Sequence, residues 1–281
     1  MTMEIALVDA VWEGTPFQGP KGLAKAKEIG FDAIDVAFDP VGRSSAEVQA
    51  FIDEVGHVGL PVRSAICVSL GVGGDYNVSV QRFHVERAKA HLDLAGRLGA
   101  SNLLLVIGEY IWQNEIIPAP DQWAAAVRNV REIAAHAEGL GLEIALELEH
   151  WTYAFLNSIP TVNRFVDEVD LGACKVNLDL NHLWAMKVEP GQIAALAGRI
   201  SHAHISDCHG EVYENLPPGR GTAPLREYLS VLVDTGFEGS LSLELGPAPA
   251  DEDIVEWVEE GYRKTLALMH ATGARASAAP A

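Results

Sequence analysis

The sequence predicts a single-domain (β/α)8 barrel, the TIM-barrel class of α/β folds. Short runs rich in Val, Ile and Leu alternate with helical patterns from one end of the 281-residue chain to the other, and eight such strand–helix units follow one another. Strands that alternate with helices are typical of a parallel sheet, and eight units favour a closed barrel. We place the barrel at residues 1–271 and expect the small, polar segment 272–281 to be a disordered tail.

The expected elements are read from apolar periodicity and from glycines at helix ends. Glycine begins the segments GFDA, GLPV, GASN, GLEI and GFEG, each placed between a helix and a strand, where a left-handed residue ends a helix. The expected strands are 4–8, 33–38, 61–70, 102–108, 142–148, 174–180, 200–206 and 240–245. The expected helices are 23–30, 44–58, 80–98, 121–138, 161–169, 191–197, 223–235 and 253–271. A doubly wound open sheet is the alternative, but GxGxxG is missing after the first strand.

The charge and composition of the chain indicate which kinds of binding partner it can have. The formal net charge is −19, and an acidic surface repels phosphate backbones, so nucleic acid is a poor candidate. No apolar run reaches the roughly 18 residues of a membrane span, so we expect no membrane association. The N-terminus lacks a secretory pattern and the three cysteines form no CxxC motif, which favours reduced thiols in a cytoplasmic protein.

Acids and histidines stand at the ends of the last four predicted strands. Because active sites of these barrels gather where the strands end, and because these strands are neighbours, we expect the side chains to converge on one side of the barrel mouth. Three carboxylates and an imidazole form a hard oxygen and nitrogen donor set that favours Mn²⁺, with Mg²⁺ and Co²⁺ as alternatives. A bound metal would stabilise an enediolate formed next to a sugar carbonyl. The four candidates are Glu147, Asp179, His204 and Glu244.

Other side chains near these strand ends are candidate substrate contacts. Glu149 lies on the same face of its strand as Glu147, so either glutamate can be the ligand; we favour Glu147 and leave Glu149 as a substrate contact. His202 is expected to form hydrogen bonds inside the barrel, one layer below His204. The remaining candidates are His150 and Trp112, the latter as a wall of a sugar pocket.

Five motifs, LELE, LDLNH, HAHISD, PPGRG and LSLEL, follow one another along the chain. In this order they resemble the xylose-isomerase-like TIM-barrel superfamily of sugar isomerases and epimerases, particularly its ketose 3-epimerase and hydroxypyruvate isomerase branch. The resemblance covers essentially the whole chain and implies that the four strand-end residues bind a divalent metal, with Glu147 and Glu244 as an acid/base pair. It also implies that His182 contacts substrate oxygens and that Arg220 reaches the substrate from the PGRG turn. Family members often form dimers or tetramers, so we expect a homo-oligomer.

The sequence departs from this family in two places. After the seventh strand, where many epimerases carry an arginine, this chain has Asp207 and His209, and we take Asp207 as a substrate contact. Where some epimerases carry a further glutamate after the strand-five ligand, this chain has Tyr153. These differences leave the choice of sugar open.

The leading hypothesis is a metal-dependent isomerase or epimerase acting on a ketose or keto-sugar. A lyase on the same scaffold is the main alternative, because the same enolate can expel a leaving group in a dehydration or in cleavage of a keto-glycoside or C-glycoside. A phosphodiester hydrolase resembling endonuclease IV would need a richer metal cluster and a basic groove, and the charge of −19 argues against it. A non-catalytic sugar-binding or accessory subunit is the remaining class.

Overall fold

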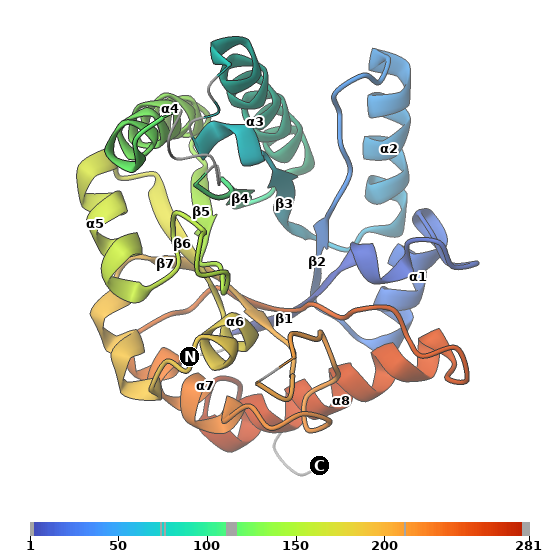
Figure 1. Ribbon diagram of the computed structural model, residues 1–281. Helices are drawn as coiled ribbons and strands as arrows, with labels where there is room; N and C mark the ends of the chain where they lie inside the picture. Colours follow the sequence, from blue (N-terminus) through green and yellow to red (C-terminus); the bar gives the residue numbers. More distant parts are fainter. Residues whose placement is uncertain (1–2, 74, 76, 111–116, 211, 277–281) are drawn as a thin grey trace.

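The computed structural model describes residues 3–73, 75, 77–110, 117–210 and 212–276. Eight parallel strands form a closed barrel in sequence order, with β8 paired to β1. The barrel lies at the centre of the molecule in Figure 1. The predicted fold class is therefore confirmed. The strands are β1 (Glu4–Val8), β2 (Ala33–Val36), β3 (Val62–Val68), β4 (Asn102–Val106), β5 (Glu143–Glu147), β6 (Cys174–Asp179), β7 (Ile200–Ile205) and β8 (Ser240–Leu243).

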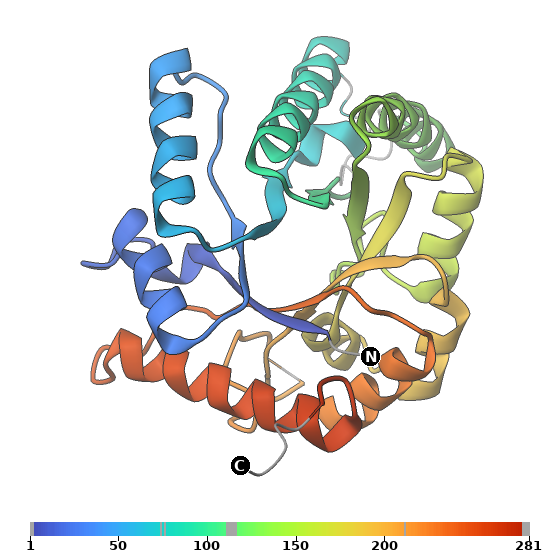
Figure 2. The same ribbon diagram turned by 180° about the vertical axis from the view of Figure 1, so that it is seen from behind.

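Helices surround the barrel on the outside in both views (Figures 1 and 2). The α-helices are α1 (Pro20–Ile29), α2 (Ser45–Val58), α3 (Val78–Leu98), α4 (Ala119–Leu140), α5 (Ile159–Val169), α6 (Leu180–Ala185), α7 (Leu225–Asp234) and α8 (Ile254–Thr272). Three 3-10 helices are η1 (Asp9–Trp12), η2 (Leu70–Gly73) and η3 (Pro190–Leu196). The helix expected at 191–197 is thus wrong in type, and the short α6, which follows β6 at the barrel mouth, was not predicted.

Local sequence explains where the helices begin and end. The Ser44 hydroxyl accepts from the Glu47 backbone, and the Glu47 side chain accepts from the Ser44 backbone, a capping box that starts α2. Four of the five predicted glycines are left-handed C-caps: Gly30, Gly59, Gly99 and Gly141. Helix α7 instead has Thr235, in a right-handed conformation, as its C-cap, and the fifth glycine, Gly236, follows it.

The apolar core lies between the strands and the surrounding helices, whereas several side chains inside the barrel are polar. Asp35, Ser64, Asn177, His202 and Ser242 are all at most 1% exposed. A polar interior has to be hydrogen-bonded internally. Asp35 accepts from the Ser64 backbone amide and contacts His202, and His202 also contacts Ser242. Asn177 instead donates to Glu147. The fold thus prepares a hydrogen-bonded layer directly below the barrel mouth.

The C-terminal segment differs from its prediction. Thr272 is the last residue of α8, Ala274 is fully buried and accepts a hydrogen bond from the Met3 backbone, and Arg275 pairs with Asp32. A disordered tail beginning at residue 272 is therefore wrong for residues 272–275, because these contacts join both ends of the described chain at the bottom of the barrel. Within the described residues, none of the helices is both long and apolar enough to cross a membrane.

Candidate functional site

The barrel brings the four predicted ligand residues to one side of its mouth. Glu147 and Asp179 are the last residues of β5 and β6, His204 lies in β7, and Glu244 directly follows β8. The strand register places Asp179 opposite His204. Because neighbouring parallel strands are about 4.8 Å apart, this register brings their side chains within reach of one another.

Asp179 is the centre of the cluster. Its carboxylate belongs to two groups of donor atoms that each lie within 4.8 Å of one another, one with Glu147 and His182 and one with His204 and Glu244. His204 Nδ1 lies 2.9 Å from Glu244 Oε2, and His182 Nδ1 lies 3.3 Å from Glu147 Oε1. We call these five residues the acidic cluster.

Two oxygens in the acidic cluster are buried without a well-formed hydrogen bond: Glu147 Oε1, whose nearest partner is His182 Nδ1 at 3.3 Å, and Asp179 Oδ2. The second oxygen of each carboxylate is already engaged. Asn177 Nδ2 donates to Glu147 Oε2 at 2.6 Å, and the backbone amides of Asn181 and His182 donate to Asp179 Oδ1 at 2.6 and 3.1 Å. A buried oxygen without a partner is costly, and a hard divalent cation is the kind of ligand that satisfies it. The donor set therefore fits a divalent metal.

Burial and mutual repulsion shift the protonation of the acids. Burial raises the pKa of Asp179 to about 6, and the carboxylates of Glu244 and Glu147 add to this shift while His182 opposes it. Burial by itself would raise the pKa of Glu244, but the hydrogen bond and charge of His204 lower it overall. For His182, burial alone would lower the pKa, but Asp179 and Glu147 raise it to about 10. Burial alone would also lower the pKa of His204, but its contacts with Asp35 and Glu244 raise it. The carboxylates of the cluster thus favour the protonated form of both imidazoles, and a cation can replace those protons.

The structure separates Glu149 from Glu147. Both glutamates lie near His182, but only Glu147 shares a group of close donor atoms with Asp179. Burial raises the pKa of Glu149 to about 7, and the charge of Glu147 contributes to the rise. This geometry favours Glu147 as the ligand and leaves Glu149 at the edge of the cluster, on the side of His150 and His182.

A buried carboxylate–histidine group lies beneath the cluster. His202 Nε2 lies 2.8 Å from Asp35 Oδ2 and 3.2 Å from Ser242 Oγ, so the prediction that His202 forms hydrogen bonds inside the barrel is confirmed. His204 Nε2 lies 3.7 Å from the same Asp35 oxygen. Our sequence reading missed Asp35, although an acid within the apolar strand AIDV could have marked it. Asp35 connects the barrel interior to a predicted metal ligand.

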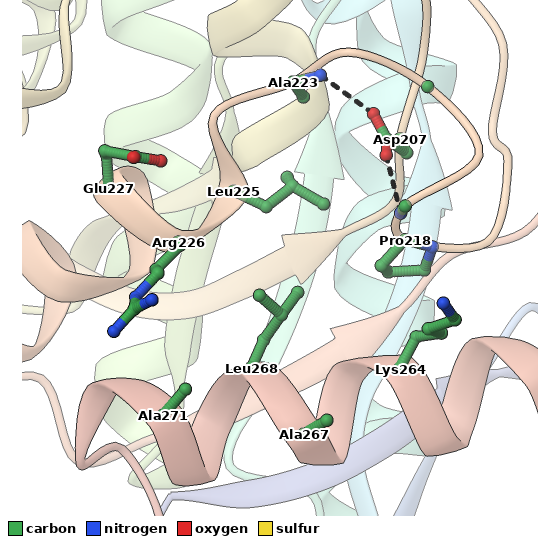
Figure 3. A pocket seen from close by; sticks show the side chains of 12 residues that line it. Asp207, Pro218, Ala223, Leu225, Arg226, Glu227, Lys264, Ala267, Leu268 and Ala271 are labelled. Carbon is green, nitrogen blue, oxygen red and sulfur yellow. Dashed lines mark hydrogen bonds between the residues drawn. The ribbon is translucent and has the colours of Figure 1, made fainter.

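Two of the predicted substrate contacts, Asp207 and Arg220, have their charged groups bound to other parts of the protein and not to the acidic cluster. Asp207 is buried, and its carboxylate accepts from the backbone amides of Cys208, Gly219 and Ala223, so it holds the 218–223 loop (Figure 3). Arg220 lies on that loop, pairs with Glu252 and Glu260, and covers the ring of Trp257.

A cavity of about 400 Å³ beside this loop lies between α7 and α8, with Leu225, Leu268 and Ala271 in its wall (Figure 3). It contains none of the acidic cluster. Trp112, the predicted wall of a sugar pocket, lies outside the described residues.

Aromatic residues next to the cluster were also missed. The Tyr213 hydroxyl forms a hydrogen bond of 2.9 Å with His182 Nε2. The Tyr213 ring stacks on the His150 ring, with centroids 4.1 Å apart. Nothing in the local pattern around Tyr213 marks it, because it reaches the site from the loop after β7. Asn177, which orients Glu147, could have been found from its alternation with Asp179 in VNLDL.

The closed barrel, with an acidic cluster where β5 to β8 end, has the arrangement that is typical of TIM-barrel enzymes. Residues 23–269 match the family described as "Xylose isomerase-like TIM barrel", and the chain belongs to this family. The resemblance inferred from the motifs is therefore confirmed.

Similar proteins include epimerases. A D-psicose 3-epimerase of Ruminiclostridium cellulolyticum is 29% identical over 79% of this chain and 76% of its own. A fructoselysine 3-epimerase of Escherichia coli O157:H7 is 23% identical over 78% of this chain and 82% of its own. The crystal structure of a D-tagatose 3-epimerase-like protein superposes with a TM-score of 0.81 at 16% identity, covering 98% of this chain and all of that one (100%). The protein is an enzyme of the isomerase and epimerase class.

Proposed function

We propose that the protein is a divalent-metal-dependent isomerase or epimerase that acts on a ketose or keto-sugar through an enediolate. The observation that carries this proposal is the pair of buried oxygens without a well-formed hydrogen bond on Glu147 and Asp179, within the reach of His182, His204 and Glu244. The similarity to sugar 3-epimerases supports the choice of substrate class.

Glu147, Asp179, His204 and Glu244 would hold the metal, with Mn²⁺ favoured and Mg²⁺ or Co²⁺ as alternatives. When bound, the ion supplies Lewis-acid polarisation of the substrate carbonyl, which acidifies the neighbouring C–H bond. Asn177 fixes one oxygen of Glu147, and the start of α6 fixes one oxygen of Asp179. The protein therefore orients these carboxylates before any ligand arrives.

Glu147 and Glu244 would exchange protons with the substrate. Glu147 ends β5 and Glu244 follows β8, and each belongs to one of the two donor groups that share Asp179. One carboxylate removes the proton from the carbon next to the carbonyl, and the electron pair moves onto the carbonyl oxygen. The other glutamate, in its acid form, returns a proton to the opposite face for epimerisation or to the neighbouring carbon for isomerisation. The substrate mass does not change.

Other side chains would bind the sugar. His182 faces the cluster with its pKa raised, and Glu149 and His150 line the adjoining edge, so all three are proposed to contact hydroxyl groups. Assembly as a homo-oligomer and residence in the cytoplasm are retained as proposals from the sequence.

The test is solvent proton exchange with matched glutamine variants. We expect Glu147→Gln and Glu244→Gln each to lower the incorporation of deuterium from D₂O into a ketose by at least about 100-fold, the range of general acid–base catalysis, while the barrel stays folded by circular dichroism. Glu238→Gln, on an exposed glutamate, is the control and should keep full exchange. Full exchange in either active-site variant would refute the roles of these glutamates. An unsaturated product of lower mass would point to a lyase instead.

A further inference from the structure

Four aromatic side chains form a continuous surface beside the acidic cluster, which we call the aromatic shelf: His150, Trp151, Tyr153 and Tyr213. Trp151 and Tyr153 are 44% and 49% exposed, among the most exposed large apolar side chains described. Their rings are nearly parallel, at 13° with centroids 6.0 Å apart. Large rings exposed side by side at an active-site mouth expose apolar area that a ligand can cover.

The shelf leads directly to the acidic cluster. His150 packs on Trp151 with ring centroids 4.0 Å apart and on His182 at 4.9 Å, and Tyr213 stacks on its other side at 4.1 Å. Two ring contacts therefore connect the exposed Trp151 to His182, which lies 3.3 Å from Glu147. A single small molecule can reach from the acidic cluster onto the shelf.

The shelf is held in place by its own loop. Glu149 N donates to Leu156 O at 2.9 Å, and Ala154 N donates to Trp151 O at 3.0 Å, so the turn is closed on itself. Tyr110 N donates to Tyr153 O at 3.0 Å, which attaches the turn to the segment after β4. Phe155, 1% exposed, anchors the turn in the core. Rings held in advance lose little freedom when a ligand covers them.

The charge on this surface selects the kind of ligand. Burial lowers the pKa of His150 to about 4, and His182 adds to the shift, so the His150 ring is neutral. The nearby carboxylates and the net charge of −19 disfavour an anionic group. A planar aromatic ring carries no charge and can stack on these side chains.

We propose that the aromatic shelf binds a neutral, planar substituent carried by the ketose, so that the substrate is a sugar conjugate rather than a free sugar. The inference rests on the proposed function, because it places the sugar at the acidic cluster. Trp151 and Tyr153 then determine specificity for the substituent, and they take no part in proton transfer.

The test compares two ligands that share one sugar. D-fructose and 1-deoxy-1-(4-methylanilino)-D-fructose share the C2 carbonyl and the hydroxyl groups from C3 to C6. The second ligand carries an arylamino group in place of the C1 hydroxyl, so only it has an aromatic ring. We expect Trp151→Ala/Tyr153→Ala to weaken binding of the arylated ketose by about 10-fold, as loss of ring contacts of about 1.4 kcal/mol requires, and to leave D-fructose unchanged. Calorimetric titration of the metal-loaded protein gives both affinities. Phe83→Ala, at a ring that is 52% exposed on α3, is the matched control.

Each outcome separates the inference from the proposed function. Equal affinity of the wild-type protein for the two ligands would refute the proposal that the aromatic shelf binds the substituent. An equal loss of affinity for both ligands in the double variant would refute it as well. A double variant that changes the molecular mass in sedimentation, from oligomer to monomer, would also overturn it and identify the shelf as a contact between subunits. If the arylated ketose binds more tightly but neither ligand exchanges deuterium with D₂O, the proposed reaction fails while the shelf stands.

Discussion

Asp35 lies in the barrel interior below the acidic cluster, and Asp35→Asn tests its role. The side chain is fully buried, accepts a hydrogen bond from Ser64 N at 3.1 Å, and lies 2.8 Å from His202 Nε2. Removing one partner of a buried hydrogen bond costs about 1–3 kcal/mol, and more where a charged group is involved. Because Asp35 is a carboxylate with several buried contacts and the asparagine oxygen can still accept one hydrogen bond, we expect the free energy of unfolding to fall by about 3 kcal/mol, the upper end of that range.

Urea denaturation measures this loss. With a denaturant slope of about 3 kcal/mol/M, the midpoint should fall by about 1 M. Asp251→Asn, at an exposed aspartate, is the control and should leave the midpoint unchanged. His202→Gln and the double variant complete a thermodynamic cycle, and direct pairing predicts a coupling of at least about 1 kcal/mol. An Asp35→Asn midpoint equal to that of the control, or fully additive effects, would refute the pairing.

Two further predictions concern Asp9, which is partly exposed, and the buried Asp207. Burial raises the pKa of Asp9 to about 7, and the charges of Asp35 and Glu13 contribute to the rise. The folded state therefore binds this proton more tightly than the unfolded state does. The free energy of unfolding should fall as the pH rises from about 4 to 7 and then level off. Asp9→Asn should flatten that part of the stability curve, and an unchanged curve would contradict the assignment. Asp207→Asn leaves a loop amide without its acceptor, which costs about 1–3 kcal/mol. It should speed hydrogen exchange at Gly219, whereas exposed Asp234→Asn should not, and equal exchange in both variants would argue against the loop-holding role.

The barrel could be predicted because its signals are local and repeated. Four of the glycine C-caps lie where GFDA, GLPV, GASN and GLEI place them, and the apolar runs identify every strand. Strand ends converge in any parallel barrel, so Glu147, Asp179 and His204 could be grouped without coordinates. Short 3-10 elements such as η3 have no comparable signal, because the difference between the two helix types depends on tertiary packing.

The missed and misplaced residues depend on contacts between distant segments. Asp35 meets His202 across the barrel interior, and Tyr213 meets His150 through loop geometry, so neither pair has a sequence spacing to recognise. Arg220 and Asp207 lie in the predicted loop, but the direction of their side chains is set by Glu252, Glu260 and the loop amides. Sequence therefore predicts which strand ends carry chemistry, whereas the loops decide which neighbours face the substrate.

The most direct measurement of the central claim is metal content combined with solvent exchange. The purified protein is analysed by inductively coupled plasma mass spectrometry, treated with a chelator, reloaded with Mn²⁺, and incubated with a panel of ketoses in D₂O. We predict about one divalent ion per chain, and deuterium incorporation next to the carbonyl that is lost on chelation and restored by Mn²⁺. Asp179→Asn should lower metal retention without unfolding the barrel. A protein that retains no divalent metal, and whose exchange and stability are indifferent to chelation, would contradict the account.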